Sequence, residues 1–238
     1  MAVRLLEMKQ TRIAVLGVYR SGSTAVSGAL HHLGVDMGPP FFEGFYESAG
    51  LSKQLRKWWD EPRLVERVGQ AKRVRVLEQW IKEREAVGTL WVGMKHPLLS
   101  LCGEDLVQAW GPETRFIRCC RPLEDSIDSL KRLGRSVDGA FLQGTLMAAL
   151  DRFFAGREHL AIEFADLMSN PRREVERLME YLNITADAAR IEAAVRFIEP
   201  GKKSKVEAEQ GEKIGAGKAP GPGTVWGAIR KVITGRDE

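Results

Sequence analysis

The sequence predicts an α/β fold in which a parallel β-sheet is covered by helices on both faces. Three observations lead to this prediction. Short, almost wholly apolar runs recur along the chain, longer segments of helical periodicity separate them, and a glycine-containing turn follows the first run. Strands that are apolar throughout are buried on both faces, which is typical of parallel sheets between layers of helices. At 238 residues, the chain has enough material for one large core.

Four strands are predicted from the apolar runs. Each run is short and is bounded by glycine, proline or polar residues, as strands of a buried sheet are. The runs are RIAVL (12–16), TLWVGM (89–94), TRFIRCC (114–120) and HLAIEF (159–164).

Helices are predicted between these strands. From Thr24, apolar residues recur at helical spacing from Val26 to Leu33, and Gly34 supplies a C-terminal stop. A helix that starts near Pro122 carries its proline in the first turn, where proline is tolerated. This helix is predicted to cover 122–133. The remaining predicted helices are pieces within 51–85 broken at Pro62, then 101–110, 140–154, 171–181 and 186–197.

The composition changes beyond Pro200, which divides the chain into a domain of residues 1–200 and a tail of residues 201–238. The tail is rich in glycine and lysine, and its stretch GAGKAPGPG (215–223) excludes regular structure. Its last segment, TVWGAIRKVITGR, places apolar residues on one helical face and predicts a short amphipathic helix that docks on the domain or on a partner.

Charge and cysteine content indicate a cytoplasmic protein that binds no nucleic acid. The formal net charge of +4 suits an anionic ligand but does not indicate nucleic acid, which calls for a clustered basic face. No apolar stretch approaches the ~18 residues that span a bilayer, and the N-terminus lacks a signal-peptide pattern. The three cysteines have no metal-type spacing and are expected to be free thiols in a reducing compartment. The sequence does not predict the oligomeric state.

The turn after the first predicted strand, GVYRSGST (17–24), is suited to bind an anion. A loop that turns into a helix directs free backbone N–H groups and the positive end of the helix dipole at one point. Gly17 and Gly22 allow the backbone to curl closely, and Ser21, Ser23 and Thr24 add hydroxyl donors. Arg20 adds a forked cationic group. Strand, glycine loop and helix together predict a P-loop NTPase-like sheet.

Two features disfavour a magnesium-dependent NTPase. Ser23 stands where the phosphate-loop pattern G-x-x-x-x-G-K-[ST] has its lysine. The predicted strands at 89–94 and 114–120 carry no carboxylate to hold magnesium, and Glu163 lies before the end of the predicted strand 159–164.

The loop YRSGST resembles the P-R-S-G-T-[ST] loop of the sulfotransferases, with Tyr19 where that family commonly has proline. The resemblance continues through ALHHLGVDMGPP, GFYE, GMKHP, RCCRPLEDSIDSLKR and EFADLMSNPRREVERLMEYLNI, which together span residues 12–200. It implies that Arg20, Ser21, Gly22, Ser23 and Thr24 bind the 5′-phosphosulfate of 3′-phosphoadenosine 5′-phosphosulfate (PAPS).

The resemblance also implies a second set of contacts, to the 3′-phosphate of the same donor. The family places an arginine at the end of a strand and a serine eight residues later. Here Arg121 follows the strand 114–120 and Ser129 lies eight residues on. Pro122 stands one position earlier than the family's proline, so a count from the proline leaves Ser126 as the alternative to Ser129.

Transfer of a sulfuryl group needs positioning, charge neutralisation on the leaving oxygen and a base for the acceptor, and cationic side chains make a metal unnecessary. The resemblance places Arg20 against the transferring sulfate. Lys95, in the motif GMKHP that resembles the family's G-x-K-x-P, follows a strand, where open α/β sheets place their ligand sites, and its charge is expected to stabilise the transition state. Two residues compete for the role of base. His96 has an ordinary pKa near ~6.5, and Glu47 stands in GFYE, where the flanking Phe45 and Tyr46 are expected to raise the pKa of its carboxyl. Glu47 is preferred.

The sequence therefore predicts a PAPS-dependent sulfotransferase that acts on a hydroxyl or amine of a small-molecule or carbohydrate acceptor. Two other hypotheses stay open at this point: a magnesium-dependent kinase or NTPase with a degenerate loop, and a non-catalytic nucleotide-binding protein. The aromatic loop 39–46 and the pair Trp58 and Trp59 are candidates for the wall of an acceptor pocket, although core packing explains them equally well.

Overall fold

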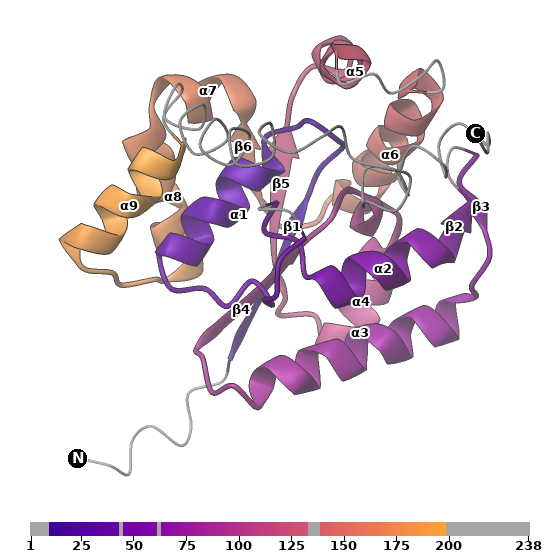
Figure 1. Ribbon diagram of the computed structural model, residues 1–238, viewed down its shortest axis with the longest axis horizontal. Helices are drawn as coiled ribbons and strands as arrows, with labels where there is room; N and C mark the ends of the chain where they lie inside the picture. The colour runs from indigo at the N-terminus through magenta and orange to yellow at the C-terminus, as the bar shows by residue number, and fades with distance from the viewer. Residues whose placement is uncertain (1–9, 43–44, 61–62, 133–138, 199–238) are drawn as a thin grey trace, which may run out of the picture. The chain divides into compact units, whose positions relative to one another are not determined.

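A parallel sheet lies at the centre of the fold. The computed structural model describes residues 10–42, 45–60, 63–132 and 139–198. In this part of the chain the sheet has four strands in the order β4–β1–β5–β6 (Figure 1). They are β1 (Thr11–Leu16), β4 (Trp91–Lys95), β5 (Arg115–Cys120) and β6 (Leu160–Glu163). All of the predicted strands are confirmed, each to within two residues at its ends.

Helices alternate with these strands, as predicted. Gly103, the first residue of α4, and Pro171, the first residue of α8, stand at helix starts that the sequence pattern had placed within two residues. The described helices are α1 (Ser23–His32), α2 (Ala49–Trp58), α3 (Gln70–Glu85), α4 (Gly103–Trp110), α5 (Leu123–Arg132), α6 (Gly139–Phe154), α7 (Phe164–Ser169), α8 (Pro171–Leu182), α9 (Ala188–Ile198) and the short 3₁₀-helix η2 (Pro97–Leu101).

Both faces of the sheet are buried, and strand β1 shows how. Its side chains alternate: Ile13 and Val15 pack with α1, α8 and α9, whereas Ala14 and Leu16 pack with α2, α3, α4 and α6. These two groups of helices lie on opposite sides of the sheet (Figure 1). All of these β1 residues are 0% exposed. Because successive side chains of a strand point to opposite faces, an apolar run is the pattern that such a doubly covered strand requires. The predicted α/β fold class is confirmed.

Three local features differ from the predictions. The segment 51–85 is helical in pieces, as predicted, but the two-stranded antiparallel hairpin β2 (Trp59–Asp60) and β3 (Val65–Glu66) that separates α2 from α3 was not predicted. Helix α7 was not predicted, because six residues are too few for a helical period to show. Phe164 begins α7, so Glu163 is the last residue of β6 rather than a residue before the strand's end.

Trp58 and Trp59 belong to the core. Their side chains are 2% and 5% exposed and pack with the cluster on the α2, α3, α4 and α6 face of the sheet. Core packing, one of the two explanations left open from the sequence, therefore accounts for them. Trp110 is also fully buried, and its indole N–H donates to the Leu77 carbonyl at 3.1 Å. This hydrogen bond satisfies the indole N–H, the one polar group of a buried tryptophan side chain.

The cysteines are free thiols, as predicted. Cys102 and Cys119 are buried and Cys120 is half-buried. Burial raises the pKa of the Cys120 thiol to about 11, so this thiol is protonated at neutral pH. None of the helices in the described ranges combines the length and apolarity that a membrane span needs. The predicted tail, residues 201–238, lies outside the described residues.

Candidate functional site

The loop between β1 and α1 has a backbone geometry that would allow close approach of an anion. Gly22 is the N-cap of α1 and has a φ of 91°. A Cβ at this position would also lie 2.8 Å from the Phe164 ring. Both facts require glycine here. The first amides of a ten-residue helix have no acceptor within the helix, and together with the helix dipole they attract negative charge.

Arg20 joins this loop to the second predicted cofactor motif. Its backbone has a φ of 66°, in the left-handed region that L-residues rarely occupy. Its Nε donates to Ser129 Oγ at 3.0 Å, and its carbonyl accepts from Arg121 Nη1 at 3.0 Å. Residues that are 101 and 109 positions apart in sequence are thus in direct contact. The loop and the Arg121–Ser129 motif form one site.

Ser129, and not the alternative Ser126, is the serine that contacts Arg20. Both serines lie on α5 and are buried. Ser126 is 0% exposed and its hydroxyl oxygen has no hydrogen-bond partner among the described residues. Arg121 stacks on Phe164, with its guanidinium carbon 4.2 Å from the ring centroid. The ring therefore supports both Gly22 and Arg121.

Lys95 supplies the cation that the loop itself lacks at Ser23. It ends β4, the parallel neighbour of β1, and its register partner is Val15. This register brings the Lys95 ammonium to the loop, where Nζ donates to Thr24 Oγ1 at 3.1 Å and to Glu47 Oε1 at 2.6 Å. Lys95 and Glu47 are 5% and 6% exposed. Two of the predicted catalytic residues, Lys95 and Glu47, thus form a buried ion pair beside the loop.

The expected direction of the Glu47 pKa shift is wrong. Burial does raise the pKa of this carboxyl, and it is the largest single effect. The charges of Lys95, His96 and Arg56 and the hydrogen bond from Lys95 together outweigh burial, so the pKa of Glu47 lies below its ordinary value. The carboxylate is ionised at neutral pH.

His96 faces the same carboxylate but is poorly arranged to act as a base. Its Nδ1 accepts the Leu98 N–H at 3.1 Å, which caps η2. In the neutral ring the proton is then on Nε2, which lies 3.7 Å from Glu47 Oε2. In this arrangement neither ring nitrogen of His96 offers a lone pair to the hydroxyl or amine of an acceptor substrate. The geometry therefore favours Glu47 over His96 as the base.

Solved structures with this arrangement of elements are known, although no protein-family model and no curated protein matches the sequence. The sulfotransferase STF9 from Mycobacterium avium matches with a TM-score of 0.54 and 13% identity, over 91% of this chain and 79% of its own. The sulfotransferase domain of the Synechococcus PCC 7002 olefin synthase matches with a TM-score of 0.50 and 17% identity, over 97% and 96%. The chain has a sulfotransferase fold.

The resemblance read from the motifs is thereby confirmed at the level of the sulfotransferase fold. An unliganded sugar kinase from Janibacter sp. HTCC2649 also matches, with a TM-score of 0.48 and 16% identity, over 76% of this chain and 98% of its own.

Two residues that shape the site of this sulfotransferase fold were not singled out from the sequence. Phe164 supports Gly22 and Arg121, as described above. Gln143, on α6, is 0% exposed and bonds both backbone groups of Tyr19. The sequence does contain a feature that could have identified Gln143, because this polar residue stands on the apolar stripe that includes Leu146 and Leu150. Phe164 gave no such signal.

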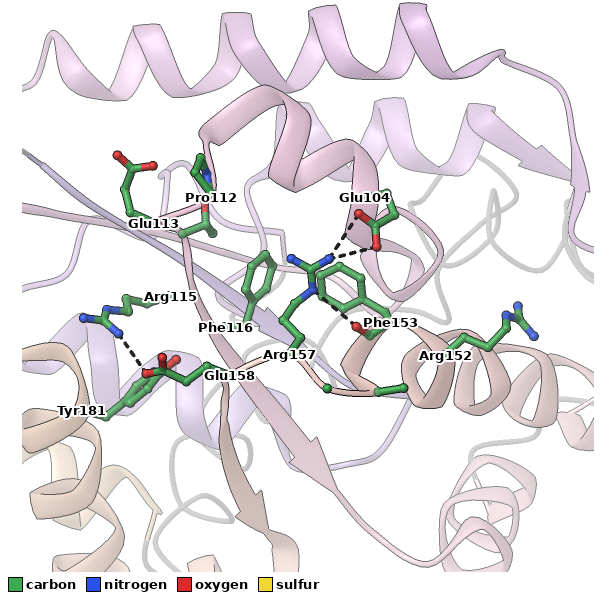
Figure 2. A pocket seen from close by; sticks show the side chains of 13 residues that line it. Glu104, Pro112, Glu113, Arg115, Phe116, Arg152, Phe153, Arg157, Glu158 and Tyr181 are labelled. Carbon is green, nitrogen blue, oxygen red and sulfur yellow. Dashed lines mark hydrogen bonds and ion pairs between the residues drawn. The ribbon is translucent and has the colours of Figure 1, made fainter.

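A cavity of about 670 Å³ lies at the opposite edge of the sheet (Figure 2). It is lined at the amino ends of β5 and β6, by residues that include Arg115, Phe116, Arg157 and Glu158. Arg157 bonds both oxygens of Glu104, at 3.0 and 3.3 Å, and covers the Phe153 ring (Figure 2). The predicted site residues do not line this cavity, because they gather at the carboxyl ends of the strands.

Proposed function

We propose that this protein transfers a sulfuryl group from PAPS to a hydroxyl or amine of a small-molecule or carbohydrate acceptor. The observation that carries the proposal is the convergence of three cations on one glycine loop. Arg20 and Arg121 meet through the Arg20 carbonyl, and Lys95 meets the loop at Thr24. A transferred group with several negative oxygens needs such a distribution of positive charge.

The residues of the site fit a donor with two phosphate-bearing ends. Ser21 Oγ and Arg121 Nε are buried polar atoms without a hydrogen-bond partner among the described residues. Unpaired buried polar atoms are costly, and phosphate oxygens would satisfy both. In this proposal the loop from Arg20 to Thr24 holds the phosphosulfate end, whereas Arg121 and Ser129 hold the 3′-phosphate.

The reaction proposed is an in-line transfer in which the new sulfur–oxygen bond to the acceptor forms as the bond to the phosphate oxygen breaks. Arg20 and Lys95 stabilise negative charge on the departing oxygen. Glu47 takes the proton of the acceptor. Its ionised carboxylate is ready to accept, and the 2.6 Å bond from Lys95 fixes its orientation.

Binding of 3′-phosphoadenosine 5′-phosphate (PAP), measured by calorimetry, tests the donor site. We expect Arg20→Ala and Arg121→Ala each to weaken binding by about tenfold to a hundredfold, since each removes a charge-assisted hydrogen bond to an anion. Arg152→Ala is the matched control, because Arg152 is an exposed arginine of the opposite cavity and should leave binding unchanged. Unchanged affinity in both site variants would refute the site.

Transfer itself is tested with labelled PAPS and a panel of hydroxyl and amine acceptors. Release of PAP with label on an acceptor supports the proposal. Magnesium-dependent turnover of ATP with indifference to PAPS would instead identify a kinase or NTPase. Tight PAP binding without transfer to any acceptor would identify a non-catalytic nucleotide-binding protein.

A further inference from the structure

We infer that Gln143 is a positioning residue that fixes the anion-binding shape of the loop from a different helix. Its amide oxygen accepts the Tyr19 N–H at 3.0 Å, and its amide nitrogen donates to the Tyr19 carbonyl at 2.7 Å. These bonds join residues 124 positions apart. The inference rests on the proposed function, because the loop that Gln143 holds is the proposed donor site.

Burial makes these two bonds obligatory. The Gln143 side chain is 0% exposed, so water cannot replace either partner. A buried amide that loses its partners is strongly disfavoured, and this leaves one arrangement of side chain and loop. Gln143 therefore sets the orientation of the peptide groups on both sides of Tyr19.

The residue that follows Tyr19 shows why such support is needed. Arg20 has a φ of 66°, which an L-residue does not adopt without help. Its carbonyl and side chain are held by Arg121 and Ser129, while Gln143 holds the preceding residue. Proline at position 19 has no N–H and would leave the Gln143 oxygen unpaired, so this chain needs a residue such as Tyr19 there.

The role differs from general support of the core. The neighbouring Leu146 is also 0% exposed and packs in the core between α6 and the sheet, but it makes no hydrogen bond to the loop. Leu146→Ala therefore destabilises α6 without removing the loop contact, which makes it the matched control for Gln143→Leu.

The first test is PAP binding by calorimetry. We expect Gln143→Leu to weaken PAP binding by about tenfold, since the Tyr19 N–H and carbonyl lose their hydrogen bonds to Gln143. Leu146→Ala, compared at a temperature where both variants are fully folded, should retain binding within about twofold of the unchanged protein. Equal losses in both variants, or no loss in Gln143→Leu, would overturn the inference.

A pH profile gives a readout that lost packing does not reproduce. In Gln143→Glu the ionised carboxylate accepts the Tyr19 N–H but repels the Tyr19 carbonyl, whereas the protonated acid both donates and accepts, as the amide does. Burial raises the pKa of such a carboxyl. We expect PAP affinity of this variant, relative to the unchanged protein, to recover as the pH is lowered from 8 to 6. A constant ratio across this range would overturn the inference.

Hydrogen exchange separates failure of this inference from failure of the proposed function. In Gln143→Leu we expect faster amide exchange in a peptide covering residues 17–24, and this acceleration should be absent in Leu146→Ala. The measurement needs no ligand. If the unchanged protein does not bind PAP, the proposed function fails, and exchange in the loop still decides whether Gln143 holds it. Equal loop exchange in Gln143→Leu and the unchanged protein would overturn the inference.

Discussion

At the carboxyl edge of the sheet, Lys95 and Glu47 form an ion pair with an N–O distance of 2.6 Å and side chains that are 4% and 8% exposed. At the amino edge, Arg157 and Glu104 form a pair at 3.0 Å with side chains that are 31% and 67% exposed. The distances are similar, but the surroundings differ. Water screens and partly replaces the exposed pair, whereas the buried pair depends entirely on its partner.

The difference fits the proposed function, which places the donor at the carboxyl edge. Burial of a charge without a partner is costly, so Lys95 and Glu47 each depend on the other. Lys95, Glu47 and Thr24 come from three separate segments that meet at the loop. The cavity at the amino edge instead carries ordinary surface ion pairs, such as Arg115 with Glu158. Four experiments test this contrast, in order of decreasing effect.

Removal of the buried cation should have the largest effect. Lys95→Met leaves the Glu47 carboxylate buried without its ammonium, and we expect a loss of about 3–5 kcal/mol in the free energy of unfolding. Urea denaturation at pH 7 measures it. The double variant Lys95→Met and Glu47→Gln removes both charges and should recover more than half of the loss. A single variant that loses less than about 1 kcal/mol would show that water reaches Glu47 and that the contrast between the edges is wrong.

Two glycines with positive φ sharpen the same comparison. Gly22 has a φ of 91° and Gly156, at the amino-edge cavity, has a φ of 74°. A Cβ at Gly22 would lie 2.8 Å from the Phe164 ring, but a Cβ at Gly156 would meet no atom within 4 Å. Alanine costs about 1–2 kcal/mol at either position through the backbone, and at Gly22 the contact with Phe164 adds to this.

We therefore expect Gly22→Ala to lower the free energy of unfolding by about 2–3 kcal/mol and Gly156→Ala by about 1 kcal/mol. Thermal and urea denaturation of both variants give the difference. PAP binding should weaken only in Gly22→Ala. Equal losses of stability would mean that Phe164 moves aside without cost.

Ionisation of the Glu47 carboxylate should make the free energy of unfolding depend on pH, with an effect smaller than those of the substitutions above. Its pKa in the folded protein is lowered from the ordinary 4.5, so its ionised form favours folding. This contribution is complete above the unfolded value of 4.5 and is lost as the pH falls through the lower folded value. Because burial opposes the lowering, the net change is smaller than the energy of the ion pair itself.

Urea denaturation midpoints between pH 3.5 and 7 measure this contribution of Glu47 to stability. Stability of the unchanged protein should decline more steeply below pH 4.5 than that of Glu47→Gln, which has no group to titrate there. Glu104→Gln, which removes an exposed carboxylate at the amino edge, is the matched comparison. Parallel profiles for Glu47→Gln and the unchanged protein would contradict the lowered pKa.

The sequence predicted the strands and most helices, and it named candidate site residues that the structure brings together, but it did not predict how those residues interact. Strands such as β1 are apolar throughout because both faces of the sheet are buried. The local sequence pattern is therefore enough to predict such a strand. Arg20, Lys95 and Arg121 could be named because each stands at the end of a strand or in its loop, and parallel strands end at one edge.

Contacts between segments that are distant in sequence could not be predicted from a local sequence pattern. The pKa of Glu47 was expected to be raised because its neighbours Phe45 and Tyr46 are aromatic. Its direction is decided instead by Lys95, which lies 48 positions away and is brought to it by the sheet. Gln143 contacts Tyr19 across 124 positions for the same reason. The hairpin β2–β3 and helix α7 were missed because each is too short to display a period.

The smallest effect is expected at the amino edge, where Glu104→Gln removes the charge that faces Arg157. Exposed ion pairs contribute about 0–1 kcal/mol, and salt screens them. Arg157 keeps its position in this variant because its guanidinium carbon lies 4.4 Å from the centre of the Phe153 ring. We expect a change below about 0.5 kcal/mol at 0.15 M salt that disappears at 1 M salt, with unchanged PAP binding. A loss comparable to that of Lys95→Met would mean that the pair at the amino edge is as dependent on its partner as the pair at the site, and exposure would then not separate the two edges.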